Sequence, residues 1–254
     1  MGVQETFFVD WVREGVARAD TQTAYRVPLI GFASAADPRF RQLQQLAEAT
    51  HLLPTDLLPT AHSVLAFFVP FAPDVVNANR AHPRNVAREW ALAYVETNAL
   101  INRISQELIA ALAELEIASA TEPATHNFDP KTLVSRWSHK SVAAIAGLGS
   151  FGLHQMLITE AGCAGRFGSL VVDLDLKPSS PPPGPLPVRC AYFAGGTCTV
   201  CVERCPTGAL TVDGLDKTLC YRWLLHVAGR FQEMGTADVC GKCATGPCSL
   251  AEAV

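Results

Sequence analysis

The chain has 254 residues, of which 49% are hydrophobic and 17% are charged, and its formal net charge is −4. This composition provides material for a large core and lacks the basic surplus of a nucleic-acid-binding surface, and it suits a homodimer. The sequence has no apolar run of about eighteen residues, so no membrane-spanning helix is expected. Residues 1–15 resemble neither a secretory signal nor a twin-arginine leader, which predicts a cytoplasmic protein.

The first predicted elements are two buried strands, Leu29–Ala33 and Ser63–Val69, which are short and apolar. Between them, residues 51–59 contain two prolines and predict a loop or a short helical turn. The clearest helix is expected over residues 86–116, because apolar residues recur there at intervals of three to four. These positions are Leu100, Ile104, Leu108, Leu112 and Leu115.

A second helix is predicted from Ser138 to Ala146 and should end at Gly147. A further strand is expected over Leu170–Leu176. Strands interleaved with long helices predict an α/β or α+β layered domain that covers residues 1–176.

Residues 177–187 form a proline-rich segment that can continue neither a helix nor a central strand. We interpret it as a linker. It separates the layered domain from a cysteine-rich domain at residues 188–254.

The nine cysteines are distributed very unevenly, because the first 189 residues contain only Cys163. Nothing in the sequence indicates export, so clustered cysteines favour metal ligation over disulfides. The other eight are Cys190, Cys198, Cys201, Cys205, Cys220, Cys240, Cys243 and Cys248.

The most specific motif begins at Cys198 and continues through Cys201 to Cys205-Pro206. Bacterial two-cluster ferredoxins have four cysteines, spaced by two, two and three residues and followed by proline, and the last cysteine binds the other cluster. Here the first position is occupied by Gly195. Cys190, five residues earlier, can fill that position if its loop is slightly longer.

Eight cysteines are the number that two 4Fe-4S clusters require, and the crossover of ferredoxin ligands suggests how to divide them. We assign one cluster to Cys190, Cys198, Cys201 and Cys248, and the other to Cys205, Cys220, Cys240 and Cys243.

Two structural zinc sites are the alternative, since tetrahedral zinc also accepts four thiolates. The Cys-Pro-Thr-Gly-Ala turn at Cys205 is more typical of ferredoxin clusters, and we therefore favour iron and sulfide. Cys163 stands apart in a glycine-rich turn and is interpreted as a free thiol.

Residues Gly147–Gly152 match the pattern G-x-G-x-x-G. A dinucleotide site would need a strand before this pattern and an acidic residue about twenty positions after it. A helix is predicted before it instead, and Asp173 and Asp175 come late. The glycines are better explained by a sharp turn or by close approach of the backbone to a flat ligand.

Several of these features occur in the order found in the epoxyqueuosine reductase and reductive dehalogenase superfamily, which the chain resembles from about Leu29 to Cys248. The family's L-L-P-x-A-x-S-V element matches residues 57–64. The long helix, the Ser138-His-Lys segment, the glycine turn, Leu157–Thr159 and the eight cysteines follow.

The resemblance implies a nitroreductase-like core that carries a cobamide such as cobalamin, and a module of two 4Fe-4S clusters that supplies electrons. It implies that His139 and Lys140 donate protons or bind an anionic group. It also implies that the corrinoid is lined by Gly147, Leu148, Gly149, Ser150, Phe151 and Gly152.

The chain also departs from this family. Epoxyqueuosine reductases have a C-terminal tRNA-binding region, whereas this sequence ends six residues after Cys248, and Asp129 does not match the spacing of their acidic proton donor. We therefore expect a short, stand-alone relative that takes electrons from a low-potential ferredoxin or flavodoxin. Its expected substrate is a small molecule or a corrinoid rather than nucleic acid. An electron-transfer protein without corrinoid and a flavin (FMN) iron–sulfur reductase are the alternatives.

Overall fold

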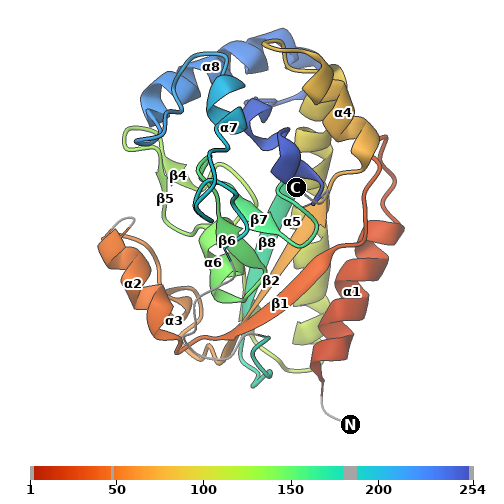
Figure 1. Cartoon of the computed structure of the whole chain (residues 1–254). Helices are drawn as coiled ribbons and strands as arrows, with labels where there is room; N and C mark the ends of the chain where they lie inside the picture. The colour runs from red at the N-terminus through yellow and green to blue at the C-terminus, as the bar shows by residue number, and fades with distance from the viewer. Residues whose placement is uncertain (1–2, 47–48, 180–187, 252–254) are drawn as a thin grey trace.

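The computed structural model describes residues 3–46, 49–179 and 188–251. At its centre is a four-stranded sheet in the order β1-β2-β8-β3, in which every pair of neighbouring strands is antiparallel (Figure 1). The strands are β1 (Leu29–Ser34), β2 (Ser63–Pro70), β8 (Gly165–Val172) and β3 (Ser119–Ala120).

Helices cover both faces of this sheet, so all eight residues of β2 are buried. Alternate side chains of β2 point to opposite faces. One face, with Phe67, packs against α1 (Glu5–Ala17) and α5 (Arg88–Ala113). The other face, with Phe68, packs against Phe40 of α2 (Pro38–Leu46) and against α6 (His139–Ile145).

Short elements complete the layered part of the chain. They are α3 (Pro54–Leu57), α4 (Pro73–Ala81), the hairpin of β4 (Phe128–Asp129) and β5 (Val134–Ser135), and the hairpin of β6 (Gly149–Phe151) and β7 (Leu157–Thr159). Ser138 caps the start of helix α6: its hydroxyl accepts a hydrogen bond from the Ser141 N–H and so satisfies a free donor of the first turn.

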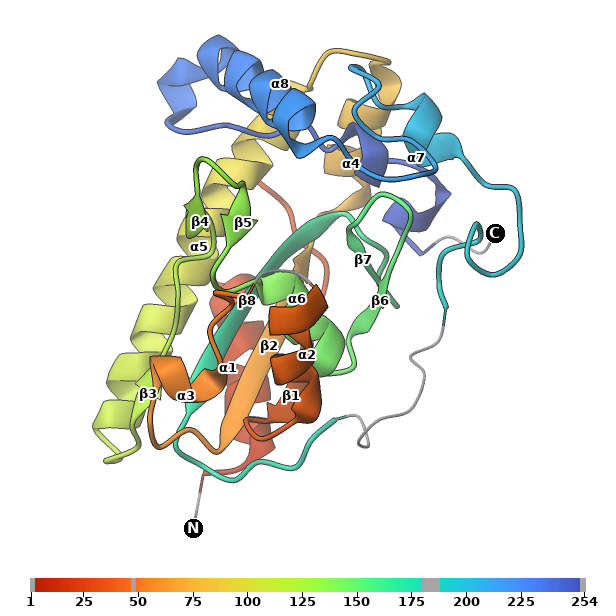
Figure 2. The ribbon, with the colours of Figure 1, turned by 90° about the vertical axis from the view of Figure 1, so that its left-hand side faces the viewer.

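The cysteine-rich part lies across one end of the sheet, next to α4 and the β6–β7 hairpin (Figure 2). Asp216 caps its long helix by accepting the N–H of Leu219. Its helices are α7 (Val200–Glu203), α8 (Lys217–Arg230) and the short 3-10 helices η1 (Gln232–Met234), η2 (Lys242–Ala244) and η3 (Pro247–Ser249).

The two parts share one hydrophobic cluster, which contains Phe71 and Trp90 of the layered part together with Leu210 and Phe231 of the cysteine-rich part. The boundaries predicted at 176 and 188 therefore separate two stretches of sequence that contribute to a common core, and the division into domains stays a prediction. Of the predicted linker, residues 177–179 are described, whereas residues 180–187 lie outside the described residues.

The predicted mixed α/β layered class is confirmed, as are the two strands and the long helix. The strand expected over Leu170–Leu176 is shifted, since β8 occupies Gly165–Val172. Its first half contains Gly165 and Gly168, which resemble a loop in the sequence. A Cβ atom at Gly168 would lie 2.4 Å from the Phe67 ring, so this glycine lets the strands pack closely. None of the described helices is long and apolar enough to cross a membrane.

Candidate functional site

A cavity of about 900 Å³ lies between the layered part and the cysteine-rich part. Its walls are mainly apolar and include Trp90 of α5, Phe128 of β4 and Phe151 of β6. Four of the eight clustered cysteines contribute to the same walls: Cys205, Cys220, Cys240 and Cys243. A ligand in this cavity would therefore lie directly beside one predicted cluster.

All nine cysteines are free of disulfides. Burial, followed by the charges of Cys248, Cys190 and Cys198, raises the pKa of Cys201 to about 11. Thiols that are held together without a metal resist ionisation because their charges repel. These four are the cysteines assigned above to the first cluster.

The second group shows the same behaviour. Burial, followed by the charges of Cys240 and Cys205, raises the pKa of Cys220 to about 11. Burial acts in the same direction on Cys205, but the N–H of Leu210 and the hydroxyl of Thr207 outweigh it and lower the pKa of that thiol. The neighbours of each thiol are compatible with the predicted division into two clusters, which stays a prediction.

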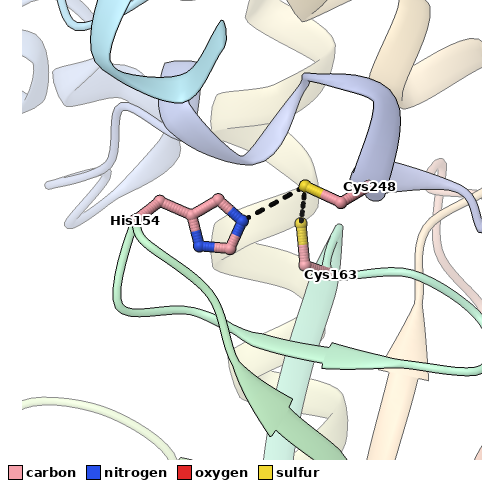
Figure 3. A group of neighbouring side chains, drawn as sticks. All are labelled: His154, Cys163 and Cys248. Atoms are coloured by element: carbon pink, nitrogen blue, oxygen red, sulfur yellow. Dashed lines mark hydrogen bonds between the residues drawn. The ribbon is translucent and has the colours of Figure 1, made fainter. Parts of the chain in front are cut away.

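Cys163, expected to stand apart, lies next to the Cys248 thiol. The two sulfur atoms are 3.9 Å apart, and Nε2 of His154 lies 3.3 Å from the Cys248 sulfur (Figure 3). Hydrogen bonding from Cys163, supported by His154, lowers the pKa of Cys248 to about 5. Cys163 is a free thiol, as interpreted from the sequence. It does not stand apart from the other cysteines, because the fold brings it next to a residue 85 positions away, which spacing alone cannot predict.

His139 is buried in the layered core, and both nitrogens of its ring have partners. Its Nε2 lies 3.0 Å from the carbonyl oxygen of Pro123, which can only accept, so Nε2 carries the proton. Its Nδ1 lies 2.8 Å from the hydroxyl of Ser169, which itself accepts the indole N–H of Trp137. The residue is absent from the cavity wall, and its geometry supports a structural role rather than the predicted proton donation.

Lys140, the next residue, does line the cavity. Its Nζ donates to the carbonyl oxygen of Gln155 at 3.1 Å. Burial lowers the pKa of this ammonium group to about 8, which brings a proton donor close to neutral pH. Of the two predicted catalytic residues, only this one faces the cavity.

The glycine turn forms the start of the β6–β7 hairpin and is preceded by α6, an arrangement that does not match a dinucleotide-binding strand and helix. Phe151 and Gly152 line the cavity, whereas Gly147, Leu148, Gly149 and Ser150 do not. Gly149 is needed because a Cβ atom there would lie 2.2 Å from the carbonyl oxygen of Ile158. Most residues of the turn therefore lie outside the cavity wall, next to the two residues that line it.

A polar group that the sequence did not reveal also faces the cavity, centred on Tyr94 of α5. Its hydroxyl donates to the carboxylate of Asp238 at 2.8 Å, and Nε2 of His126 lies 3.1 Å from the same carboxylate. The guanidinium of Arg166 lies 4.5 Å from the centre of the Tyr94 ring. Burial raises the pKa of Tyr94, which keeps the phenol protonated. These side chains come from four segments, and no local motif connects them.

Asp129 is exposed and outside the cavity wall. Its carboxylate accepts the N–H groups of Lys131 and Thr132, as a turn-stabilising aspartate does. This position agrees with the sequence analysis, in which the spacing of Asp129 did not match that of the acidic proton donor of epoxyqueuosine reductases.

No family model matches the sequence. Among curated proteins, the epoxyqueuosine reductase of Bacillus cereus is 27% identical over 226 residues, which cover 80% of this chain and 54% of that protein. The epoxyqueuosine reductase of Staphylococcus aureus is 29% identical over 229 residues, which cover 79% of this chain and 53% of that protein. The chain thus spans about half the length of these relatives.

Solved structures show the same fold. An epoxyqueuosine reductase crystallised with an epoxyqueuosine-modified tRNA stem loop matches with a TM-score of 0.59 and 19% identity over 96% of this chain and 66% of that chain. The epoxyqueuosine reductase of Bacillus subtilis matches over the same shares with a TM-score of 0.58 and 18% identity.

Helices lie on both faces of an antiparallel sheet, a cysteine-rich part lies across one end, and a cavity lies between the two parts, which defines a mixed α/β protein with a cysteine-rich part. Within that class, the chain is similar in sequence to the epoxyqueuosine reductases over about four fifths of its length and shares their fold.

Proposed function

We propose that the chain is an iron–sulfur reductase that passes electrons through two 4Fe-4S clusters to a cobamide bound in the central cavity. The carrying observation is the position of the cavity, whose wall combines the layered core with Cys205, Cys220, Cys240 and Cys243. An electron leaving that cluster would have a short path into the cavity. The names of the curated relatives, all reductases, support the same reaction class.

The donor chemistry fits the clusters. Each group contains four thiols, which is the ligand set of one 4Fe-4S cluster, and none of these thiols is tied up in a disulfide. Burial is the largest cause of the raised pKa values of Cys201 and Cys220, and the charges of the neighbouring thiols add to it. Iron would remove this cost by holding the sulfurs as thiolates.

The cavity also fits a large, flat cofactor. Its volume of about 900 Å³ is at the upper end of the range for small-molecule sites, roughly 300–1,000 Å³. Among the described residues, the indole Nε1 atoms of two cavity-wall residues, Trp90 and Trp223, are buried without a hydrogen-bond partner. A cobamide supplies a cobalt centre that accepts electrons and reacts with substrate. FMN is the alternative occupant.

The protein's own contribution is a proton source. We assign proton donation to the Tyr94 hydroxyl, which Asp238 holds in place and which the Arg166 guanidinium would stabilise as a phenolate. His126 is partly exposed and contacts the same carboxylate, so it connects this buried group to the protein surface. Lys140 also lines the cavity wall and suits an anionic group of a ligand.

We infer that the substrate is a small molecule or a corrinoid, reduced with electrons from a ferredoxin or flavodoxin. A tRNA substrate is the second candidate, because a structural relative is known with an epoxyqueuosine-modified tRNA stem loop. The net charge of −4 favours the first candidate. An electron-transfer protein that binds neither cobamide nor flavin remains the competing function.

Anaerobic reconstitution with iron and sulfide, followed by titration with cobalamin, tests the proposal. We expect about eight irons per chain and a shift of the cobalamin spectrum to the base-off form. Eight irons without cobalamin uptake would contradict the cobamide and direct the search to FMN or a docked redox partner. A zinc-containing protein without iron would contradict the clusters.

Turnover with a reduced viologen dye then separates the two substrates, with small epoxides and an epoxyqueuosine-modified stem loop assayed in parallel. Tyr94→Phe should keep the iron and the cobalamin but lose roughly 100-fold or more in rate, as expected for loss of a general acid. Tyr192→Phe, outside the cavity wall, is the matched control. Equal rates for both variants would remove Tyr94 from the mechanism.

A further inference from the structure

Two side chains of the layered core reach the sulfur atom of Cys248 (Figure 3). His154 follows β6, and Cys163 precedes β8, whereas Cys248 lies in η3 of the cysteine-rich part. All three ligand atoms lie within 4.8 Å of one another. His154 is 4% exposed and Cys163 is 1% exposed, so both donors are largely shielded from bulk solvent.

The hydrogen bonds of His154 show which nitrogen of its ring carries the proton. The N–H of Met156 donates to Nδ1 at 3.0 Å, so Nδ1 acts as an acceptor and carries no proton. In the neutral ring the proton then lies on Nε2, which points at the Cys248 sulfur at 3.3 Å. His154 is therefore a fixed donor to this sulfur and has no free lone pair with which to bind a metal.

Cys163 offers its S–H to the same atom. Its sulfur lies 3.9 Å from the Cys248 sulfur and 3.8 Å from the carbonyl oxygen of Ala244. A thiolate is a much stronger acceptor than a neutral carbonyl group, so a metal-bound Cys248 would draw this proton toward itself.

The backbone holds this arrangement in place. The N–H of Cys163 donates to the carbonyl oxygens of Cys248 and Ser249 at 3.0 and 3.1 Å, and Ala164 donates to Ser249 at 3.1 Å. Gly162 allows the approach, because it has a φ of 84° and a Cβ atom there would lie 2.1 Å from the Ser249 carbonyl oxygen. Backbone hydrogen bonds and a close backbone approach thus hold the two parts together at this contact.

We propose that His154 and Cys163 are positioning residues that raise the reduction potential of the cluster bound by Cys248, through hydrogen bonds to its sulfur. The inference rests on the two-cluster function proposed above. Reduction adds an electron to the cluster, and hydrogen bonds to the ligand sulfur stabilise the added negative charge. Cys163, the ninth cysteine, is then a donor to a ligand and not a ligand itself.

The other predicted cluster has its own donors. Cys205 accepts the N–H of Leu210 at 3.4 Å, and its sulfur lies 3.6 Å from the hydroxyl of Thr207. No residue of the layered core takes part in these two contacts. The two potentials can therefore be changed separately, and Thr207→Val provides a matched control for the Cys248 side.

The test is an EPR-monitored redox titration of the full chain with both clusters reconstituted. Cys163→Ala and His154→Phe should each keep the wild-type iron content and shift the same cluster to a lower potential. The double variant should shift it further, and Thr207→Val should shift only the other cluster. His154→Gln, which keeps an N–H donor, and Cys163→Ser, which keeps a hydroxyl, should restore part of the potential.

The outcomes are separable. A wild-type protein without clusters would refute the proposed function itself. Wild-type clusters whose potentials do not change in either variant would refute this inference alone. Loss of half the iron in Cys163→Ala, together with full iron in Cys163→Ser, would also refute it, because it would show a packing requirement rather than tuning.

Discussion

His139 and His154 are both buried, yet their hydrogen bonds give them different roles. Each ring accepts at Nδ1 and donates at Nε2, but His139 donates to a backbone carbonyl inside the core, whereas His154 donates to a cysteine sulfur at the junction. The resemblance to a known family singled out His139 as catalytic, since its position next to Lys140 is visible in the sequence. The partners of a ring nitrogen are not visible there, because they come from Pro123 and Ser169.

The buried His139 predicts a pH dependence of stability. Burial lowers its pKa from 6.5 in the unfolded chain to about 4 in the folded protein. Between these values the unfolded chain binds more protons, so the free energy of unfolding should fall as the pH falls from 6.5 to 4. A pKa difference of this size is worth about 3 kcal/mol when the pH reaches 4.

Urea denaturation at a series of pH values checks this prediction. His139→Gln should flatten the pH dependence between pH 6.5 and 4, whatever it does to stability at neutral pH. His82→Gln changes an exposed side chain and should leave the dependence intact. A slope that is the same in all three proteins would assign the acid sensitivity to other groups.

The residues of the candidate site differ in how far the sequence could predict them. The cysteine spacing from Cys198 to Cys205 is a local signal, because one short loop must wrap around a cluster. The pair of Tyr94 and Asp238 has no such signal, since 144 residues separate the two side chains that meet at 2.8 Å. Tyr94 in the sequence is one of many inward-facing residues of a long helix.

Among the elements, the β6–β7 hairpin depends on backbone contact rather than on side chains. A Cβ atom at Gly149 would lie 2.2 Å from the carbonyl oxygen and 2.8 Å from the carbonyl carbon of Ile158. The backbone cannot move aside as a side chain can, so the hairpin and its cavity wall would shift. This explains the glycine spacing that a dinucleotide-binding motif would otherwise have explained.

Gly149→Ala should therefore lower the free energy of unfolding by roughly 1–3 kcal/mol, as overpacking does. Gly229→Ala is the matched control, because α8 contains this glycine and a Cβ atom there meets nothing within 4 Å. Alanine in a helix should stabilise the protein by up to about 1 kcal/mol. Chemical denaturation of both variants measures the difference, and equal effects would show that the β6–β7 contact carries no strain.

Element prediction succeeded where one pattern dominated. Strand β2 is a continuous apolar run because both of its faces are buried. Helix α5 is periodic because one of its faces is buried. The shift of β8 shows the limit of local prediction. Gly165 and Gly168 are needed in this strand because a Cβ atom at either position would clash with the ring of Phe68 or Phe67 on the neighbouring strand. A sequence read locally contains no information on that neighbour.

For the whole molecule, α4 connects the cysteine-rich part to the layered core. The ammonium group of Lys242 is fully buried and donates to the carbonyl oxygens of Asn79 and His82 and to the side-chain oxygen of Asn79. Arg80 donates to the carbonyl oxygen of Thr245 and to the hydroxyl of Ser249. Through these contacts, folding of the segment that carries Cys240, Cys243 and Cys248 is coupled to the core.

Removal of iron should therefore destabilise more of the structure than the cysteine ligands themselves. Outside α8, the cysteine-rich part consists of short helices and turns, so most of its order must come from the clusters and from the shared core. We expect anaerobic chelation to lower the melting temperature and to speed amide exchange over residues 190–250. The β6–β7 hairpin should respond with them, because its neighbours His154 and Cys163 contact Cys248. The amides of β1, β2 and β8 should stay protected, since helices on both faces bury them.

The control is the same protein with its clusters rebuilt from iron and sulfide, which should regain the original exchange. Unchanged exchange after chelation would mean that the polar and apolar contacts of the core hold the cysteine-rich part without metal.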